Sequence, residues 1–428
     1  MHILFFSDHH PDSLGGVQTS LILQKKYLER AGHKVTVVAA RRYRRKRNLT
    51  DLIEVPSLPL PPTGAYSIQP SLHLAFRKAE KDLAELAVPV DVVHIQADVW
   101  NAILGAKWAI DHKLPLVQTM HTNLQVAFDH NVGKVGGRTV GRILNRWAST
   151  FLNQPMPENP TSLWAFQKQI AQHSNYIASP SGHYNRELIK QGVTKEAFVF
   201  PNGVDDDVVE GITHEWQEAS TRTLKFIWAG RFSSEKRIVE FLEAFAKADL
   251  KNVTLDIYGS GQLEAFVRLQ VKQLGLSKTV HVRGRLPHKQ LVATFATADL
   301  VAQSSIGFET QGMTVYEAIA VGTPVFVVDP LIAGELPAEN VWLSKKPSID
   351  EMARTLKRAA ADIRARGAIA GGNRVEAAGL ERERPRIKSG ARLPYISPRS
   401  RRIAYHLATL ALCSARVLAN QCPPVPSA

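Results

Sequence analysis

Short apolar runs alternate with helix-length amphipathic segments through the first half of the chain. The run at residues 3–6 is followed by the pair Gly15-Gly16 and then by residues 17–30, whose leucines suit one helical face. Strands that alternate with helices in this way pair in parallel through right-handed crossovers. The pattern predicts an open α/β sheet with further strands at residues 34–39, 91–95, 115–119, 176–179 and 198–200.

The same alternation starts again in the second half, with strands expected at residues 224–228, 253–258, 280–284, 299–302 and 324–328. A second run of this kind indicates a second doubly wound domain, joined to the first at the Pro- and Gly-containing residues 201–205. Ligands of such sheets bind beyond the carboxyl ends of the strands, so two facing domains would share a site in the cleft. We expect Rossmann-like domains at residues 1–202 and 203–370, followed by a poorly specified, atypical basic tail at residues 371–428.

Positive charge is concentrated toward that tail. The chain has a formal net charge of +14, from 53 Lys and Arg against 39 Asp and Glu. Residues 351–428 hold 15 of the basic and 5 of the acidic residues, which leaves 38 and 34 for residues 1–350. Net charge is therefore a poor argument for nucleic-acid binding, and we expect no nucleic-acid partner. From Gly371 the sequence is Arg-rich with one candidate helix near residues 402–418, as an out-of-frame or replaced C-terminus would be.

Length and composition exclude several classes of protein. A chain of 428 residues is long enough for two or three domains, and 44% hydrophobic with 21% charged residues is typical of a globular protein. The cysteines, Cys413 and Cys422, are too few for a disulfide scaffold or a multi-cysteine zinc site and suit a reducing compartment. The first residues suit a strand better than a signal peptide, and no apolar stretch approaches the ~18 residues of a membrane span. We expect a cytoplasmic protein.

Two strand-to-helix turns carry residues that suit an anionic ligand. Gly15-Gly16 would let the backbone approach a ligand at a helix N-terminus, where free N–H groups attract anions, although a simple tight turn would look the same. Arg231 and Lys236 place two cations at the expected start of another helix, where a diphosphate would offset their charge. A solvated charge pair is the alternative for these two residues.

Glu309 and Glu317 flank a third turn, in which a helix is expected to begin near Gly312, Met313 and Thr314. Free N–H groups at those three positions would point at a phosphate, and carboxylates accept hydrogen bonds from sugar hydroxyls. Either glutamate alone would be an ordinary helix-start charge. Together with the Gly-Thr-Pro sequence that follows, the set is specific.

In these motifs and their order the chain resembles retaining glycosyltransferases of family 4, which have the two-domain GT-B fold. The resemblance covers residues 1 to about 330, roughly three quarters of the chain. Any single motif could arise by chance, whereas the ordered set is specific. Besides the three turns above, the matching segments are residues 31–35, 91–94, 119–121, 202–205 and 258–261.

The resemblance implies a role for each candidate residue. Gly15 and Gly16 would close over the diphosphate and the acceptor, and His121 would lie near the reacting face of the sugar. Arg231 and Lys236 would neutralise the leaving nucleoside diphosphate. The remaining roles are a sugar hydroxyl for Glu309, the nucleotide ribose for Glu317, and backbone N–H contacts to phosphate and sugar for Gly312, Met313 and Thr314.

The resemblance also implies no cofactor and no metal, because protein cations stabilise the leaving group. Asp205-Asp206-Asp207 would suit a metal by composition, but three acids directly after a linker are more simply a solvated turn. No dedicated carboxylate nucleophile is evident from the sequence. We therefore expect the front-face attack proposed for relatives, in which the leaving phosphate deprotonates the acceptor hydroxyl.

Two basic clusters in the first domain bear on the acceptor. Six of the seven residues from Arg41 to Arg47 are basic. Each base near an anionic surface contributes ~1 kcal/mol, so the clusters could hold the domain at a membrane. A solvated loop and an ordinary surface helix are the alternatives. The second cluster has a base at every fourth position of an amphipathic helical pattern, at Lys134, Arg138, Arg142 and Arg146.

We therefore expect a metal-independent, retaining hexosyltransferase at the inner face of the plasma membrane, with a nucleoside-diphosphate sugar as donor and a lipid-linked or polyol acceptor. GDP-mannose and UDP-glucose are the expected donors, from their frequency among relatives. Two alternatives stay open: a GT-B sugar-nucleotide epimerase, and an inactive relative that acts as a basic membrane-binding protein. Relatives end in a helix that braces the first domain, and the sequence after Ala370 contains no convincing copy of it.

Overall fold

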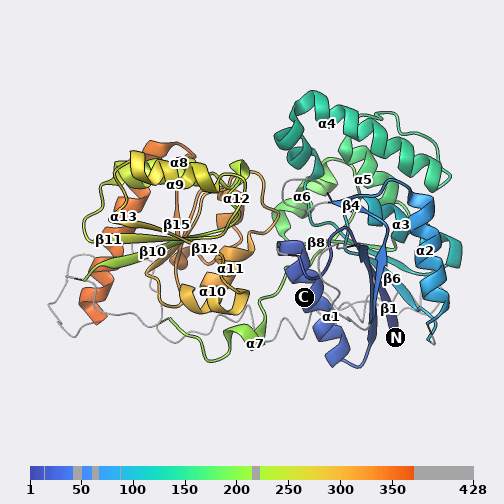
Figure 1. The fold of residues 1–428 in the computed structure, drawn as a ribbon, viewed down its shortest axis with the longest axis horizontal. Coiled ribbons are helices and arrows are strands. Elements are labelled where there is room, and N and C mark those ends of the chain that lie inside the picture. Colours follow the sequence, from blue (N-terminus) through green and yellow to red (C-terminus); the bar gives the residue numbers. More distant parts are fainter. Residues whose placement is uncertain (14, 42–50, 60–66, 87, 215–221, 371–428) are drawn as a thin grey trace. The chain divides into compact units, whose positions relative to one another are not determined.

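The structure, a computed structural model, describes residues 1–370 apart from residues 14, 42–50, 60–66, 87 and 215–221. The expected tail at residues 371–428 lies outside the described residues. The chain forms two compact units, which divide between Gly203 and Val204 (Figure 1). Each unit contains a parallel sheet with helices on both faces, so the predicted pair of Rossmann-like α/β domains is confirmed.

The first unit is built on a seven-stranded parallel sheet within its described residues, in the spatial order β3-β2-β1-β6-β7-β8-β9. The chain starts in the middle of this sheet and moves outward first on one side and then on the other. A separate antiparallel pair joins β4 to β5. The strands are β1 (His2–Ser7), β2 (Lys34–Ala40), β3 (Leu52–Val55), β4 (Leu58–Pro59), β5 (Ser67–Ile68), β6 (Val92–Ile95), β7 (Leu116–Thr119), β8 (Tyr176–Ser179) and β9 (Phe198–Val199).

Side chains of β1 alternate between two cores, one on each face of the first sheet. Leu4 and Phe6 pack with residues of α2, α3, α4 and α5, whereas Ile3 and Phe5 pack with residues of α1. Burial on both faces explains why the strands read as nearly continuous apolar runs. The helices of this unit are α1 (Gly16–Arg30), α2 (Leu72–Ala84), α3 (Trp100–His112), α4 (Leu124–Phe151), α5 (Leu163–Ala171) and α6 (Gly182–Lys190).

Helix α4 begins well before the predicted basic helix and contains a break. Gly133 has non-helical angles, φ 73° and ψ 165°, so the basic stretch occupies the part of α4 that follows it. On the inner face, Asn145 Nδ2 donates to the carbonyl oxygens of Gly141 and Ser162 at 2.8 and 2.9 Å. A Cβ at Gly141 would overlap the Thr161 carbonyl oxygen. These contacts hold α4 in one rotation against the segment that precedes α5.

The second unit repeats the architecture with six parallel strands among its described residues, in the order β12-β11-β10-β13-β14-β15. The strands are β10 (Leu224–Ala229), β11 (Val253–Tyr258), β12 (Val280–Gly284), β13 (Leu300–Gln303), β14 (Val325–Val327) and β15 (Val341–Leu343). The helices are α7 (Asp206–Val209), α8 (Ile238–Ala248), α9 (Glu264–Gln273), α10 (His288–Phe295), α11 (Met313–Ala320), α12 (Pro330–Ala333) and α13 (Ile349–Ala370), with 3-10 turns η1 (Ser234–Lys236) and η2 (Ala338–Asn340).

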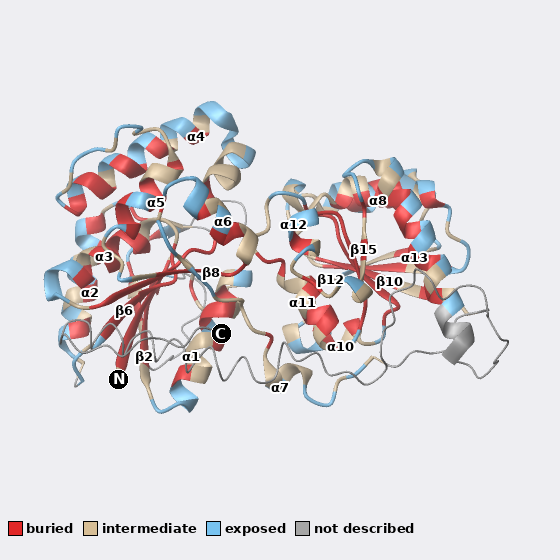
Figure 2. Ribbon diagram, turned by 180° about the vertical axis from the view of Figure 1, so that it is seen from behind, coloured by how far each residue is buried: buried red, intermediate tan, exposed pale blue. Residues whose placement is uncertain are grey.

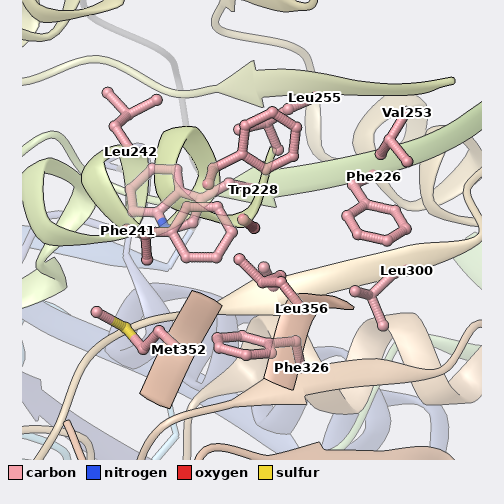
Figure 3. Packing of buried hydrophobic residues seen from close by; sticks show 14 of the residues in the cluster. Phe226, Trp228, Phe241, Leu242, Val253, Leu255, Leu300, Phe326, Met352 and Leu356 are labelled. Atoms are coloured by element: carbon pink, nitrogen blue, oxygen red, sulfur yellow. The ribbon is translucent and has the colours of Figure 1, made fainter. Parts of the chain in front are cut away.

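The second sheet is also buried on both faces, as the red strands of Figure 2 show. Phe226 and Trp228 of β10 belong to one buried core with Phe241 of α8 and Met352 of α13 (Figure 3). The intervening Ile227 belongs to the core on the opposite face, which α10 and α11 cover. The sheet is therefore a rigid central layer, and its loops are the parts that can be shaped for a ligand.

All predicted strands are confirmed, with ends that shift by no more than one residue. The sequence analysis missed β3, β15 and the β4–β5 pair. Strand β3 alternates buried and half-buried positions directly after the basic run, and β15 has only three residues. Both are edge strands, which pair on one side only. An edge strand can therefore form with a weaker strand pattern in its sequence than a central strand.

Candidate functional site

The second sheet reverses its strand order at β10, which lies between β11 and β13. Such switch points are the usual ligand sites of doubly wound sheets, at the carboxyl ends of the strands. Here the loops after β10 and β13 are joined directly. Trp228 Nε1 donates to Ser304 Oγ at 2.9 Å, and Ser304 Oγ donates to the Lys236 carbonyl oxygen at 2.6 Å. The predicted residues Arg231 and Glu309 lie on these same two loops.

Main-chain contacts hold the loop that carries Arg231. Phe232 N, the next residue, donates to the Ser260 carbonyl oxygen at 3.0 Å. Gly259, on the loop after β11, has a φ of 139°, and a Cβ there would overlap the Gly230 carbonyl oxygen. The two loops therefore touch main chain to main chain, an approach that requires glycine.

Lys236 and Glu309, predicted for different parts of a substrate, form an ion pair. Lys236 Nζ donates to Glu309 Oε1, and Ser305 Oγ donates to the same oxygen at 3.0 Å. The two charged side chains are only 26% and 13% exposed, so water screens their interaction weakly. The sheet thus brings the predicted cation and the predicted carboxylate to one point from positions 73 residues apart.

The turn that carries Lys236 differs from the prediction. We expected a helix to start between Arg231 and Lys236, but Ser234–Lys236 is a 3-10 turn and α8 begins only at Ile238. Arg237 separates the two with a left-handed φ of 52°. Lys236 therefore precedes the helix and belongs to the loop, because the chain changes direction after it.

Helix α11 begins where the sequence predicts. Gly312 is its N-cap with a left-handed φ of 77°, and Met313 and Thr314 are its first helical residues. A Cβ at Gly312 would lie 2.6 Å from Gln303 Nε2, at the end of β13. The first N–H groups of a helix have no intrahelical partner and attract anions, which suits the predicted phosphate contact. That contact stays a prediction.

Glu317 has a partner that the sequence analysis missed. It lies one turn into α11 with 6% exposure, and its Oε1 is 2.7 Å from His288 Nε2. The hydrogen bond to Glu317 raises the pKa of His288 above its ordinary value despite partial burial. The signal that could have found His288 is its place at the start of a helix directly after β12, at the same sheet edge. The ribose contact predicted for Glu317 stays a prediction.

The first sheet reverses its order between β1 and β6, and His121 follows the next strand, β7. His121 is 5% exposed, and its Nε2 lies 2.6 Å from Gln96 Oε1. Its main-chain N–H donates to Asp98 Oδ1 at 3.1 Å. Burial, with a smaller effect of His9, lowers the pKa of His121 to about 3, so the ring is neutral at pH 7. Contact of His121 with a sugar stays a prediction.

Two acids at this edge were also missed. Asp8, after β1, accepts the main-chain N–H groups of Asp98, Val99 and Asn101 within 2.8 Å and so caps the start of α3. Burial, and to a lesser extent the charge of Asp8, raise the pKa of Asp98 to about 7. Asp8 directly follows β1 and Asp98 lies three residues after the end of β6, and this position after a strand is the sequence signal that could have identified them.

Gly15 and Gly16 lie at the start of α1, as predicted. Gly15 is the N-cap in extended conformation, and its carbonyl oxygen accepts the Thr19 N–H at 3.0 Å and the Thr19 hydroxyl at 3.1 Å. A Cβ at Gly15 would overlap only the end of the flexible Gln18 side chain. The contact of this pair with a diphosphate stays a prediction.

The three consecutive acids form a helix start. Asp205 is the N-cap of α7, and its Oδ1 accepts the Asp207 N–H at 3.1 Å. Within the described part of the chain, no group of three or more His, Cys, Asp or Glu side chains could hold a metal ion. The expected absence of a metal and of a cofactor stays a prediction.

The basic part of α4 presents its charges to solvent. Its four bases, at every fourth position, are all exposed, and so are Val135 and Ile143. Figure 2 shows exposed positions along α4. No acidic residue occurs in the sequence between Asp129 and Glu158. In the other basic cluster, residues 42–47 lie outside the described residues. None of the helices that the structure describes has the length and apolar character needed to span a bilayer.

Two family models match the chain, one for each unit. Glycosyltransferase Family 4 matches residues 14–208, and Glycosyl transferases group 1 matches residues 212–370. Among curated proteins, the chain is 25% identical over 336 residues to alpha-monoglucosyldiacylglycerol synthase of Acholeplasma laidlawii. The aligned region covers 76% of this chain and 80% of that protein. It is 23% identical over 332 residues to the protein of the same name from Streptococcus pneumoniae, which covers 76% and 70%.

Solved structures share the fold at low sequence identity. Sucrose-phosphate synthase from Thermosynechococcus elongatus has a TM-score of 0.64 with 15% identity, over 98% of each chain. HepE from Anabaena, in complex with UDP and glucose, has a TM-score of 0.63 with 18% identity, over 98% of this chain and 100% of that chain. A second HepE structure with the same values contains UDP-glucose.

Proposed function

We propose, from the premise that this chain belongs to the family 4 glycosyltransferases and has their GT-B fold, that it transfers a hexose to a diacylglycerol-type lipid. The observation that carries the proposal is the Lys236–Glu309 pair beside the N-terminus of α11. This arrangement suits a substrate that is anionic at one end and rich in hydroxyl groups at the other, which describes a nucleoside-diphosphate sugar.

UDP-glucose is the proposed donor. The two HepE structures contain UDP with glucose and UDP-glucose, and the two curated relatives are named for a glucosyl product. These similarities favour UDP-glucose over GDP-mannose, the other donor expected from the sequence. Because UDP-glucose has an α linkage and those relatives are named for α products, we propose retention of the anomeric configuration.

The proposed step exchanges one bond at the anomeric carbon. The bond from this carbon to the diphosphate oxygen breaks, and the acceptor hydroxyl oxygen forms a bond to it from the same face. The hydroxyl proton passes to the departing phosphate oxygen. Negative charge grows on the diphosphate, where Arg231, Lys236 and the first N–H groups of α11 would stabilise it. No resident cofactor or metal is needed for this step.

The acceptor side of the proposal rests on α4. Its exposed face combines bases with apolar side chains, which is typical of helices that lie in a membrane interface. Diacylglycerol resides in membranes, so a peripheral attachment to an anionic bilayer would bring the enzyme to its acceptor. We propose that this face of α4 binds the bilayer surface.

A transfer assay tests the proposed function. The purified full chain would be incubated with radiolabelled UDP-glucose and anionic vesicles that contain diacylglycerol, and labelled lipid would be extracted. We expect α-linked glucosyl lipid, identified by NMR of the anomeric proton. An epimerised donor without lipid product would assign the epimerase alternative. Vesicle binding without turnover of UDP-glucose or GDP-mannose would assign the inactive alternative, and either result overturns the proposal.

Replacing the lysine of the ion pair tests the leaving-group contact. We expect Lys236→Ala to lower kcat by about 10²-fold, the usual effect of removing one such donor. Lys251→Ala is the matched control, because Lys251 is an exposed lysine of the same unit whose side chain forms an ion pair with the exposed Asp249. Steady-state kinetics of both variants provide the measurement. Equal rates for the two variants contradict the assignment of Lys236.

A further inference from the structure

Five polar side chains of the first unit form a continuous chain of hydrogen bonds. Ser20 Oγ donates to Asn202 Oδ1 at 2.5 Å and accepts from Gln24 Nε2 at 3.0 Å. Gln96 Nε2 donates to Gln24 Oε1 at 2.6 Å, and Gln96 Oε1 lies 2.6 Å from His121 Nε2. These hydrogen bonds connect Asn202, through α1 and the residue after β6, to the loop after β7.

Most of this chain is withdrawn from water. Ser20, Gln96 and His121 are buried, and Gln24 is half-buried. A buried polar group that loses its partner costs about 1–3 kcal/mol, so each member restricts its neighbour to one arrangement. The five hydrogen-bonded side chains are therefore expected to change their arrangement together.

The orientation of Gln96 decides which ring nitrogen of His121 carries the proton. The amide nitrogen of Gln96 donates to Gln24 Oε1 at 2.6 Å and lies 3.1 Å from His94 Nε2. Its amide oxygen, which can only accept, is then the atom that faces His121 Nε2. Nε2 must donate, and Nδ1 of the neutral ring is therefore an acceptor.

We propose that Gln96 is a positioning residue of the transfer reaction: it holds His121 as the Nε2–H tautomer and, through Gln24 and Ser20, ties that tautomer to Asn202. The inference rests on the proposed function and on the role that the family resemblance implies for His121, near the reacting face of the sugar. In this tautomer Nδ1 is the acceptor nitrogen of the ring, and a hydroxyl group is a donor that suits it. The neutral ring in this state does not supply a proton to the leaving group, which agrees with a leaving phosphate that takes its proton from the acceptor.

Nuclear magnetic resonance of the histidine rings tests the tautomer directly. Two-bond correlations between ring protons and nitrogens distinguish Nε2–H from Nδ1–H in the full chain labelled with ¹⁵N-histidine. The His121 signals would be identified by their absence in His121→Gln. We expect the Nε2–H pattern in the wild type at pH 8. The Nδ1–H pattern there overturns the proposal.

Two variants of Gln96 separate its two functional groups. Gln96→Leu removes the acceptor, so we expect the Nε2–H pattern to change to Nδ1–H or to a mixture. Gln96→Glu keeps an acceptor, so the Nε2–H pattern should persist. An unchanged pattern in Gln96→Leu, or its loss in Gln96→Glu, overturns the proposal. Gln118→Leu is the matched control. Gln118 is a buried glutamine of the same sheet that accepts a hydrogen bond from Ser174 and is not one of the five connected side chains.

Gln24→Leu provides a second route should Gln96→Leu fail to fold. It removes the acceptor that orients the Gln96 amide, so we expect a mixture of His121 tautomers. An unchanged Nε2–H pattern in this variant overturns the part of the proposal in which Gln24, Ser20 and Asn202 help to fix the tautomer. Thermal unfolding of each variant shows whether it is folded before spectra are compared.

Kinetics then connect the tautomer to transfer. We expect Gln96→Leu to lower kcat by about 10- to 100-fold, the size of loss seen when the partners that orient metal-ligating histidines are removed, with the KM for UDP-glucose unchanged. Gln96→Glu should recover most of that loss. A raised KM with unchanged kcat would overturn the positioning role. The spectra need no substrate, so they decide the tautomer even if the wild type transfers no glucose, a result that would overturn the proposed function alone.

Discussion

Two glutamates of the second unit, Glu309 and Glu317, differ in the kind of cation they meet. Glu309, in the loop before α11, pairs with a lysine. Glu317, within α11, pairs with His288, and this hydrogen bond raises the pKa of His288.

The His288–Glu317 pair should make the stability of the protein depend on pH. Because its folded-state pKa is raised, the contribution of His288 is complete below about pH 6.5 and is lost as pH rises through the raised pKa. His288→Ala should therefore lower the free energy of unfolding more at pH 6 than at pH 9. Urea denaturation at both pH values is the measurement. In a Glu317→Gln background the difference between the pH values should disappear, and equal losses in the wild-type background contradict the pairing.

The turns that carry the candidate residues could be located from the sequence, but the partners of these residues could not. Arg231 and Lys236 lie in one such turn and Glu317 follows another, and the glycines, charges and spacing of both turns are visible locally. Their partners come from distant loops: His288 lies 29 residues from Glu317, and Gln96 lies 25 residues from His121. Which loops meet depends on the order of the strands in the sheet, and a single sequence does not state that order.

At the scale of elements, contact between the loops after β10 and β11 depends on Gly259. Gly259→Ala would force a Cβ against the Gly230 carbonyl oxygen, so we expect a loss of about 3 kcal/mol or more in the free energy of unfolding. Gly275→Ala is the matched control: φ is 70° there, but nothing lies within 4 Å of the added Cβ, so the loss should be about 1 kcal/mol. Urea denaturation compares them. A loss at Gly259 no larger than at Gly275 contradicts the close approach.

Helix α4 shows where element prediction from sequence ends. The spacing of its bases correctly indicated a helix after Lys134, because a solvated face with period 3.6 is a strong local signal. The earlier turns, before the break at Gly133, lack that stripe and were missed. Strands β3 and β15 were missed because strands of four and three residues are too short for a clear pattern in the sequence.

At the scale of the whole molecule, the exposed stripe of α4 should govern attachment to anionic vesicles. Replacing Arg138 and Arg142 by Ala removes about 2 kcal/mol of attraction, so the vesicle partition coefficient should fall about 30-fold at low salt. Lys272→Ala with Lys278→Ala is the control, because it changes the net charge equally at exposed positions of the other unit. Co-sedimentation with the full chain is the measurement. Equal loss in both pairs would assign binding to net charge alone.

The anchor at Asn145 has a consequence for how this surface can vary. Asn145 and Gly141 fix the inner side of α4 against the neighbouring segment. The direction in which each base points therefore depends on its number of residues from these two positions. One residue inserted just upstream of Gly141 would turn everything before it by about 100°. Individual bases can be exchanged one at a time without disturbing the anchor. An insertion or deletion keeps the bases pointing in the same direction only if it adds or removes whole helical turns. The length of the helix is therefore more tightly constrained than the identity of any single base.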